Sequence, residues 1–221
     1  MDRTFTENKE ISIQVSLSGF SFNGSPWHPA EQVFTTPELQ RKWEHVEISM
    51  LTPKVALVPD VFLDPSSARK SLAEVVKLRD DDFVETVPVP AFEATLVYSL
   101  SLDESLSRVI SQTVIPASGE AVRVLPEMYY LLRELDHIQE YNKIVASWHA
   151  GHLHLVIAQG KSLCLANVFD APDFTTAEYF LFLGLKRLQL NPEVSTVYFR
   201  TPLDQEAEMS LYRYFKAVVQ L

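Results

Sequence analysis

The chain has 221 residues, of which 47% are hydrophobic and 22% charged, and a formal net charge of −10. A globular chain of this length buries roughly 70% of the surface that it exposes when unfolded, and the composition excludes intrinsic disorder. Neither half is basic, which argues against nucleic acids and anionic membranes as ligands, because proteins bind both through clustered Lys and Arg.

The first half of the chain is predicted to form strands with short helices between them. Strict alternation of apolar and polar residues around Ser18-Gly19 predicts a β-hairpin, and Asp64 before Pro65 is typical of a helix start. In chain order, the predicted elements are strands at 11–17 and 20–22, a short helix at 37–43, strands at 46–51 and 54–59, a helix at 65–78, an edge strand at 84–92, a strand at 95–102 and a helix at 103–112.

The second half is predicted to contain a three-stranded meander. Ala150-Gly151 and Gly160-Lys161 each fit a two-residue hairpin turn, and Thr175–Glu178 matches a helix capping box. In chain order, the predicted elements are a helix at 126–139, strands at 144–148, 153–158 and 163–169, a helix at 175–190, a strand at 197–200 and a helix at 205–219.

Pairing across Ala150-Gly151 divides the meander into an apolar face and a partly polar face. The polar face carries Ser147, His149, His152 and His154. Three imidazoles could supply the nitrogen ligands of zinc, or they could contact an anionic ligand with a charge that changes near neutral pH. We favour a role without metal, either at a solvent-facing hairpin end or in the lining of the cleft, because no Asp, Glu or Cys on the same hairpin completes a ligand set.

The N-terminus and the single cysteine indicate a cytoplasmic protein. Residues 1–10 are polar where a signal peptide needs an apolar core, and Cys164 has no partner within the chain for a disulfide. The most apolar stretch, Tyr179–Leu185, is shorter than the ~20 residues that span a bilayer. We therefore expect no membrane insertion.

The hairpin at Ile13–Phe22, the meander and the helix beginning at Thr175 together resemble an uncharacterised bacterial domain-of-unknown-function family with an actin-like ATPase fold. The resemblance implies an α/β protein with a two-lobed actin-like ATPase (ribonuclease H-like) fold and two duplicated mixed-sheet halves. It also implies a division into residues 1–118 and 119–221. Periodicity alone supports only a mixed α/β fold with hairpins.

Nucleotide-binding members of the wider actin-like superfamily place an aspartate and glycines at the first hairpin of each half. The aspartate orients magnesium, and the turn approaches the phosphates. Here Ser16 and Ser147 occupy the two aspartate positions, and the glycine pair expected near Arg200–Pro202 is missing. The resemblance assigns any phosphate binding to Ser16, Ser18, Gly19, Ser147, His149 and Gly151.

These replacements imply a pseudo-ATPase, because a serine hydroxyl lacks the negative charge with which carboxylates hold Mg²⁺. We expect no catalytic residues, no metal and no cofactor, and a function through interaction with an unknown protein or with a second copy as a homodimer. The alternative is an ATP-binding or ATP-hydrolysing enzyme of the actin/sugar-kinase superfamily. In that case Asp60, Asp64 or Asp170 would supply the missing ligand for Mg²⁺ with ATP.

Overall fold

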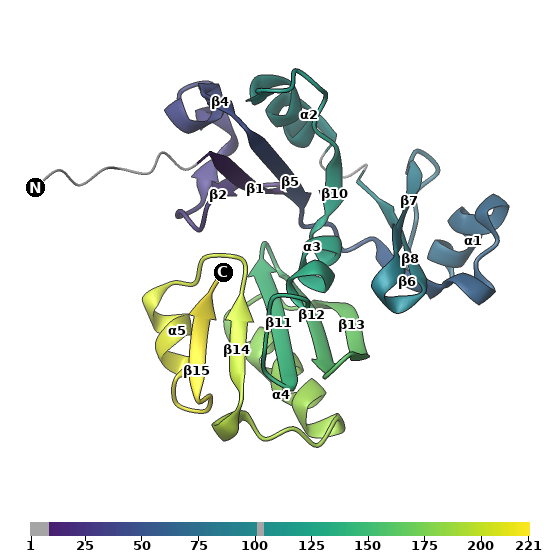
Figure 1. The fold of residues 1–221 in the computed structure, drawn as a ribbon, viewed down its shortest axis with the longest axis vertical. Coiled ribbons are helices and arrows are strands. Elements are labelled where there is room, and N and C mark those ends of the chain that lie inside the picture. The colour runs from purple at the N-terminus through teal and green to yellow at the C-terminus, as the bar shows by residue number, and fades with distance from the viewer. Residues whose placement is uncertain (1–8, 101–103) are drawn as a thin grey trace, which may run out of the picture.

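The fold has two lobes and a smaller sheet beside them (Figure 1). The structure is a computed structural model, which describes residues 9–100 and 104–221. The chain builds most of the first lobe, leaves it for the small sheet, returns to it and then enters the second lobe. This arrangement agrees with the predicted mixed α/β, two-lobed class.

The first lobe is a five-stranded sheet in the order β10-β5-β1-β2-β3. β1 is antiparallel to β2 and parallel to β5, and α2 (Glu104–Thr113) packs against β1 and β5. A two-stranded ribbon, β4 (Lys42–Trp43) with β9 (Ile115–Pro116), adjoins it. The strands of the sheet are β1 (Glu10–Ser16), β2 (Gly19–Phe22), β3 (His28–Pro29), β5 (His45–Met50) and β10 (Val124–Pro126).

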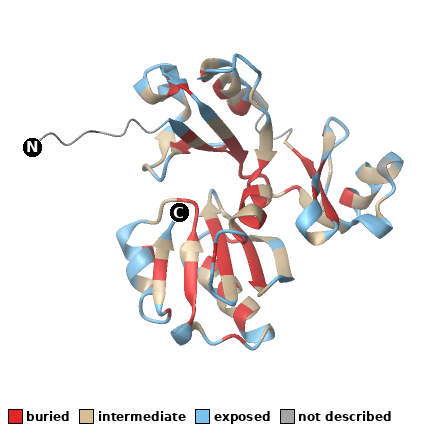
Figure 2. Cartoon of the chain, viewed as in Figure 1, coloured by how far each residue is buried: buried red, intermediate tan, exposed pale blue. Residues whose placement is uncertain are grey.

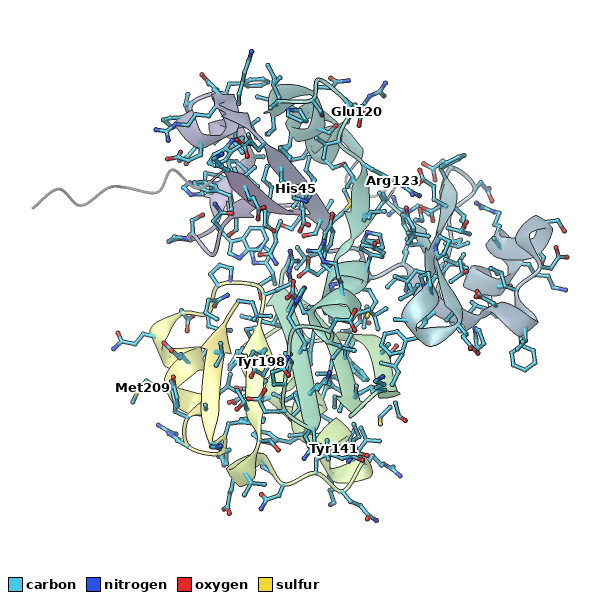
Figure 3. All side chains as sticks on the ribbon, viewed as in Figure 1. His45, Glu120, Arg123, Tyr141, Tyr198 and Met209 are labelled. Atoms are coloured by element: carbon cyan, nitrogen blue, oxygen red, sulfur yellow. The ribbon has the colours of Figure 1, made fainter. Side chains whose placement is uncertain are left out.

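The small sheet is antiparallel, in the order β6-β8-β7. Its elements are β6 (Val55–Pro59), β7 (Val84–Val89), β8 (Ala94–Ser99) and the helix α1 (Ala68–Ala73). Arg123, labelled in Figure 3, precedes β10 of the first lobe and reaches the small sheet, where its Nη2 donates to the carbonyl oxygen of Thr86 at 3.2 Å. The predicted edge position of β7 is confirmed, since Pro88 removes a donor that a central strand needs.

The second lobe follows α3 (Glu127–Glu134), a helix that contacts strands of both large sheets. Its sheet has the order β13-β12-β11-β14-β15, and α4 (Phe174–Arg187) packs on β12 and β13. A short helix, α5 (Gln205–Leu211), precedes the last strand. The strands are β11 (Asn142–His149), β12 (His152–Gln159), β13 (Ser162–Asp170), β14 (Thr196–Phe199) and β15 (Ala217–Gln220).

The predicted meander is confirmed, together with its register. Trp148 pairs with Leu153 and Ser147 with His154. The turn residues Ala150 and Gly151 both have positive φ, at 49° and 82°, as the favoured two-residue hairpin turn requires.

The partly polar face of this hairpin is not solvent-facing, because both faces of its strands pack into apolar cores. Leu153 and Leu155 enter one apolar core with α4, while Val156 and Ala158, on the opposite face, enter a second core with α3 and the small sheet. Figure 2 shows the central strands of this sheet as buried. Ser147 and His154 are consequently 0% exposed.

The final predicted helix, 205–219, was wrong in its second half. α5 ends at Leu211, and β15 then pairs in parallel with β14. Val218 is buried in the core of the lobe. In a strand of four residues that follows a helix, the alternation of side chains is difficult to distinguish from a continued helical pattern.

Three other helix predictions had incorrect bounds. The helix predicted at 37–43 is one 3-10 turn at Pro37–Gln40, and those at 65–78 and 126–139 end early, at Ala73 and Glu134. The N-cap of α4 is Asp173, whose side chain accepts from the Thr176 N–H at 2.7 Å, rather than Thr175. The predictions at 95–102 and 103–112 fall partly on residues 101–103, outside the described residues.

Further short 3-10 turns occupy residues 30–32, 60–62, 65–67, 90–92 and 192–194. β10, at residues 124–126, belongs to the sheet of the first lobe, and the division at residue 118 stays a prediction.

Among the helices within the described ranges, none combines the length and apolar character needed to cross a bilayer.

Candidate functional site

The tips of the two hairpins that the sequence analysis compared lie against each other. The hydroxyl of Ser18, in the turn after β1, lies 3.1 Å from Nε2 of His149 at the end of β11. The ring of Trp27 stacks on the His149 ring with centroids 3.5 Å apart. The two lobes are therefore joined directly at the positions where the resemblance places the phosphate turns.

His149 brings no positive charge to this contact at neutral pH. Burial lowers the pKa of His149 to about 4, so the imidazole is neutral and one of its nitrogens can accept a hydrogen bond. For His149, this burial, to which the stacked Trp27 ring contributes, disfavours the alternative in which the histidines contact an anionic ligand with a charge that changes near neutral pH.

Ser16, which the resemblance places at the first aspartate position, is 1% exposed. Its hydroxyl lies 3.1 Å from that of Ser18 and donates to the carbonyl oxygen of Gly19 at 3.4 Å. The turn consists of Leu17 and Ser18, because Ser16 pairs with Gly19. Gly19 therefore lies outside the turn, and a glycine is needed there because a Cβ would lie 2.0 Å from the carbonyl oxygen of His28.

Ser147, which the resemblance places at the second aspartate position, donates to a carboxylate. Its hydroxyl lies 2.6 Å from Oε1 of Glu127, the first residue of α3, and Gln14 of β1 donates to the same oxygen at 2.9 Å. Glu127 is 0% exposed. A buried carboxylate from another segment therefore lies beside this position.

The charge of Glu127 is neutralised by Arg200, which follows β14. Nη1 of Arg200 lies 2.6 Å from Oε2 of Glu127. Burial alone would raise the pKa of Glu127, but the Arg200 guanidinium and the Ser147 hydroxyl outweigh burial and hold this pKa below its ordinary value. Glu127 is consequently ionised and paired at neutral pH.

Arg200 also connects the two lobes. Its Nη2 donates to the Ser12 hydroxyl of β1 at 2.9 Å, and its guanidinium carbon lies 4.8 Å from the centroid of the Tyr130 ring. Its backbone N–H donates to the carbonyl oxygen of Ala146 in β11 at 2.9 Å. We call Gln14, Glu127, Ser147 and Arg200 the interlobe network.

Two cavities adjoin these contacts. The first has a volume of about 440 Å³ and is lined mostly by polar and charged residues, and the second, of about 470 Å³, has two indole rings in its wall. The first is lined by Ser12, Gln14, Asn23, Gly24, Glu47, Glu134, Arg200 and Leu221. The second is lined by Gly24, Pro26, Trp27, Trp148, His149, Pro202, Leu203 and Asp204.

The remaining predicted site residues lie apart from the interlobe network. Nδ1 of His152 lies 3.1 Å from the carbonyl oxygen of Ala150, and its Nε2 lies 3.5 Å from the Asp170 carboxylate. Gly151 supplies the positive φ of the hairpin turn. Over residues 9–100 and 104–221, no group of three His, Cys, Asp or Glu residues is placed to hold a metal ion.

The three aspartates of the enzyme alternative have other contacts. Asp60 accepts from the hydroxyl of Thr95 at 2.8 Å, and Asp64 accepts from the backbone N–H of Ser66 at the 3-10 turn that precedes α1. Asp170 lies at the end of β13 with its side chain 95% exposed. The carboxylate that lies beside a predicted position is that of Glu127, which sequence reasoning missed.

His154 is the one residue of the polar face whose side chain has no hydrogen bond in the described structure. Both of its ring nitrogens are buried without a partner, and burial lowers its pKa to about 4. Between pH 6.5 and pH 4 the unfolded chain binds a proton that the folded chain does not. Stability is therefore lost as the pH falls through this window.

We predict that His154→Leu removes this part of the acid sensitivity. The wild type should lose about 3 kcal/mol more than the variant between pH 6.5 and pH 4, since one pKa unit corresponds to 1.36 kcal/mol. At pH 7 the variant should be at least as stable, because no hydrogen bond is removed. Urea unfolding at pH 7, 5.5 and 4 measures both effects, and parallel losses in the two proteins would contradict the prediction.

The comparisons with known proteins agree with this geometry. A family model described as "Protein of unknown function (DUF3822)" matches residues 30–218. A Bacteroides thetaiotaomicron protein with an actin-like ATPase fold and unknown function is similar at a TM-score of 0.68 and 15% identity, over 100% of this chain and 94% of that one. The predicted actin-like fold is thereby confirmed.

A second solved structure is also similar. It is the PilM-PilN type IV pilus biogenesis complex, with a TM-score of 0.51 and 12% identity over 96% of this chain and 88% of that one. At these identities, both likenesses concern the fold alone. No curated protein matches the sequence.

Proposed function

The chain belongs to the DUF3822 family of proteins of unknown function and has an actin-like ATPase fold, and from this premise we propose that it is a non-catalytic member of that fold which acts through protein interaction. The observation that carries the proposal is the contact of Ser18 with His149 beneath the Trp27 ring. Ser18 and His149, which the resemblance assigns to phosphate binding, thus contact each other.

The electrostatics of the interlobe network support the same proposal. Phosphate groups require positive charge or free N–H and O–H donors at these turns. His149 is neutral, the Ser147 hydroxyl donates to Glu127, and Arg200 is paired with the same carboxylate. A nucleotide would have to break these interactions before it gained any of its own.

The protein-interaction part of the proposal draws on the fold. One similar structure is of PilM in a complex with PilN, which indicates that a protein with this architecture can serve as a binding partner. By analogy, we expect this chain to bind another protein or a second copy of itself in the cytoplasm. It would do so without a cofactor.

One observation favours the enzyme alternative. Glu127 places a carboxylate 2.6 Å from the hydroxyl of Ser147, where the superfamily has an aspartate. If Arg200 moved away from Glu127, this carboxylate could help to hold Mg²⁺ with ATP. The alternative therefore requires that the ion pair opens when nucleotide binds.

We predict that titration of the protein with ATP and Mg²⁺ in a calorimeter gives no binding heat, and that phosphate release stays at the level of the buffer. Micromolar binding together with turnover would overturn the proposed function. Should binding occur, Glu127→Gln tests whether this carboxylate is the metal ligand, because the amide retains the size of the side chain and lacks its charge.

A further inference from the structure

One cavity of the molecule is formed by residues of both large lobes. It has a volume of about 470 Å³, which is within the range of sites that bind small molecules. The loop after β2 contributes Trp27, the end of β11 contributes Trp148 and His149, and the segment after β14 contributes Asp204. Figure 1 shows this end of β14 on the side of the second lobe that faces the first lobe. We call this cavity the indole pocket.

Both indole rings of the pocket are held in place by contacts within the protein. Nε1 of Trp148 donates to the carbonyl oxygen of Ala171 at 3.0 Å, and the Trp148 ring packs edge-on against the Phe174 ring with centroids 5.2 Å apart. The Trp27 ring stacks on the ring of His149. Two prolines and a leucine make most of the remaining lining apolar. Because the rings are ordered before a ligand arrives, binding costs little conformational entropy.

The pocket carries a negative charge and no positive charge at neutral pH. Among the described residues that line it, Asp204 is the acidic one and none is Lys or Arg. The Asp204 carboxylate accepts from the backbone N–H of Ala207 at 2.8 Å, and within the described ranges no ion pair cancels its charge. Burial lowers the pKa of His149 to about 4, so its imidazole is neutral. The indole pocket thus combines aromatic rings with one carboxylate.

We propose that the indole pocket binds an organic cation, with a quaternary ammonium or guanidinium group held by the two indole rings and the Asp204 carboxylate. Cations of this kind are weakly hydrated, and the face of a tryptophan ring attracts them. The inference goes beyond the proposed function. It holds for a free small molecule and for an arginine side chain of a partner protein, because the recognising chemistry is the same.

Other classes of ligand fit the pocket less well. A metal ion such as Ca²⁺ takes about 6–8 oxygen ligands, whereas the described lining offers a single carboxylate. The phosphates of a nucleotide would meet the same carboxylate, which repels them. A neutral apolar molecule would gain from the rings and leave the charge of Asp204 without a partner. The charge of the ligand is therefore the property to test.

The test is an NMR titration of the full chain at pH 7 that follows the indole N–H signals of its three tryptophans. The cationic probes are choline and N-acetylarginine amide. We expect saturable shifts of the Trp27 and Trp148 signals with at least one cation. Trp43 is the internal control, because it is 7% exposed and its Nε1 donates to the carbonyl oxygen of Glu38 at 2.8 Å, in the core of the first lobe.

A neutral probe and a matched pair of variants isolate the charge. Dimethylbutanol, the uncharged analogue of choline in which carbon replaces nitrogen, should bind at least about fivefold more weakly than the cation. Asp204→Asn should weaken binding of the cation at least about threefold, because the amide lacks the charge and still caps the helix. Asp64→Asn is the control and should bind within about 1.5-fold, since Asp64 is also an N-cap but does not line the pocket.

Several results would overturn the proposal: no shift of the Trp27 and Trp148 signals with either cation, an equal shift of the Trp43 signal, equal affinity for dimethylbutanol, or unchanged affinity of Asp204→Asn. A response to N-acetylarginine amide alone supports the proposal with a partner's side chain as the source of the cation, and a response to choline alone supports it with a small molecule. An unchanged Trp43 signal verifies that each variant is folded. None of these outcomes bears on the ATP titration, which tests the absence of catalysis separately.

Discussion

Replacing Arg200 with methionine is expected to lower the free energy of unfolding by about 3–5 kcal/mol, the range for removing one partner of a buried ion pair. Arg200 is 7% exposed, and Glu127, its partner at 2.6 Å, is 0% exposed. The variant leaves the Glu127 carboxylate buried without its positive charge. Because domains are stable by roughly 5–15 kcal/mol in total, the loss should be evident in a urea unfolding curve.

Two controls separate the buried charge from a general loss of packing. The double variant Arg200→Met with Glu127→Gln should recover most of the stability, because no unpaired charge remains. Lys9→Met breaks the exposed pair of Lys9 with Glu44, 2.8 Å apart, and should cost no more than about 1 kcal/mol. A double variant as unstable as Arg200→Met alone would show that Arg200 acts through its packing on Tyr130.

The hairpin strands of both lobes could be predicted because a strand pattern and a turn coincided. The β1–β2 hairpin alternates around its turn, and the meander β11–β13 has three evenly spaced apolar runs separated by two turns. β10 has only three residues, and β15 directly follows a helix whose predicted pattern continued into it. Both are strands because each lies in parallel beside a strand that was predicted, β5 and β14 respectively.

The interlobe network could be predicted only at Ser147, where a hairpin and a family resemblance marked the position. Glu127 and Arg200 are 73 residues apart, and each looks ordinary in its own segment: a Glu in the first turn of a helix and an Arg after a strand. Their pairing depends on α3 crossing to the second sheet. No local pattern in the sequence contains that information.

The burial of His154 and Ser147 was missed for a related reason. An alternating strand predicts which side chains share a face but not what covers that face. The face that carries Ser147 and His154 is covered by α3 and the small sheet, and the chain builds both of these before it reaches β11. Polar residues on a strand can therefore indicate a buried polar network instead of exposure to solvent.

Ser147→Asp restores the aspartate of the superfamily and is expected to destabilise the protein by about 3 kcal/mol or more. The new carboxylate would lie beside Glu127, whose Oε1 is 2.6 Å from the Ser147 hydroxyl, and Arg200 can neutralise only one of the two charges. Like charges in a buried site raise the pKa of one carboxyl group. The difference from wild type should shrink as the pH falls, because a proton then neutralises that group. Unfolding at pH 7 and pH 5 measures both effects.

Ser16→Asp is the matched control, since Ser16 is equally buried and its hydroxyl contacts Ser18 and Gly19 without a neighbouring carboxylate. Its instability should be smaller and should depend less on pH.

Magnesium distinguishes the non-catalytic hypothesis from the enzyme alternative. If Arg200 remains paired with Glu127, Mg²⁺ does not bind beside the new carboxylate, so the instability of Ser147→Asp should persist when Mg²⁺ is added. Recovery of stability with Mg²⁺, accompanied by ATP binding, would instead indicate a metal site that one substitution can restore, and would favour the enzyme alternative.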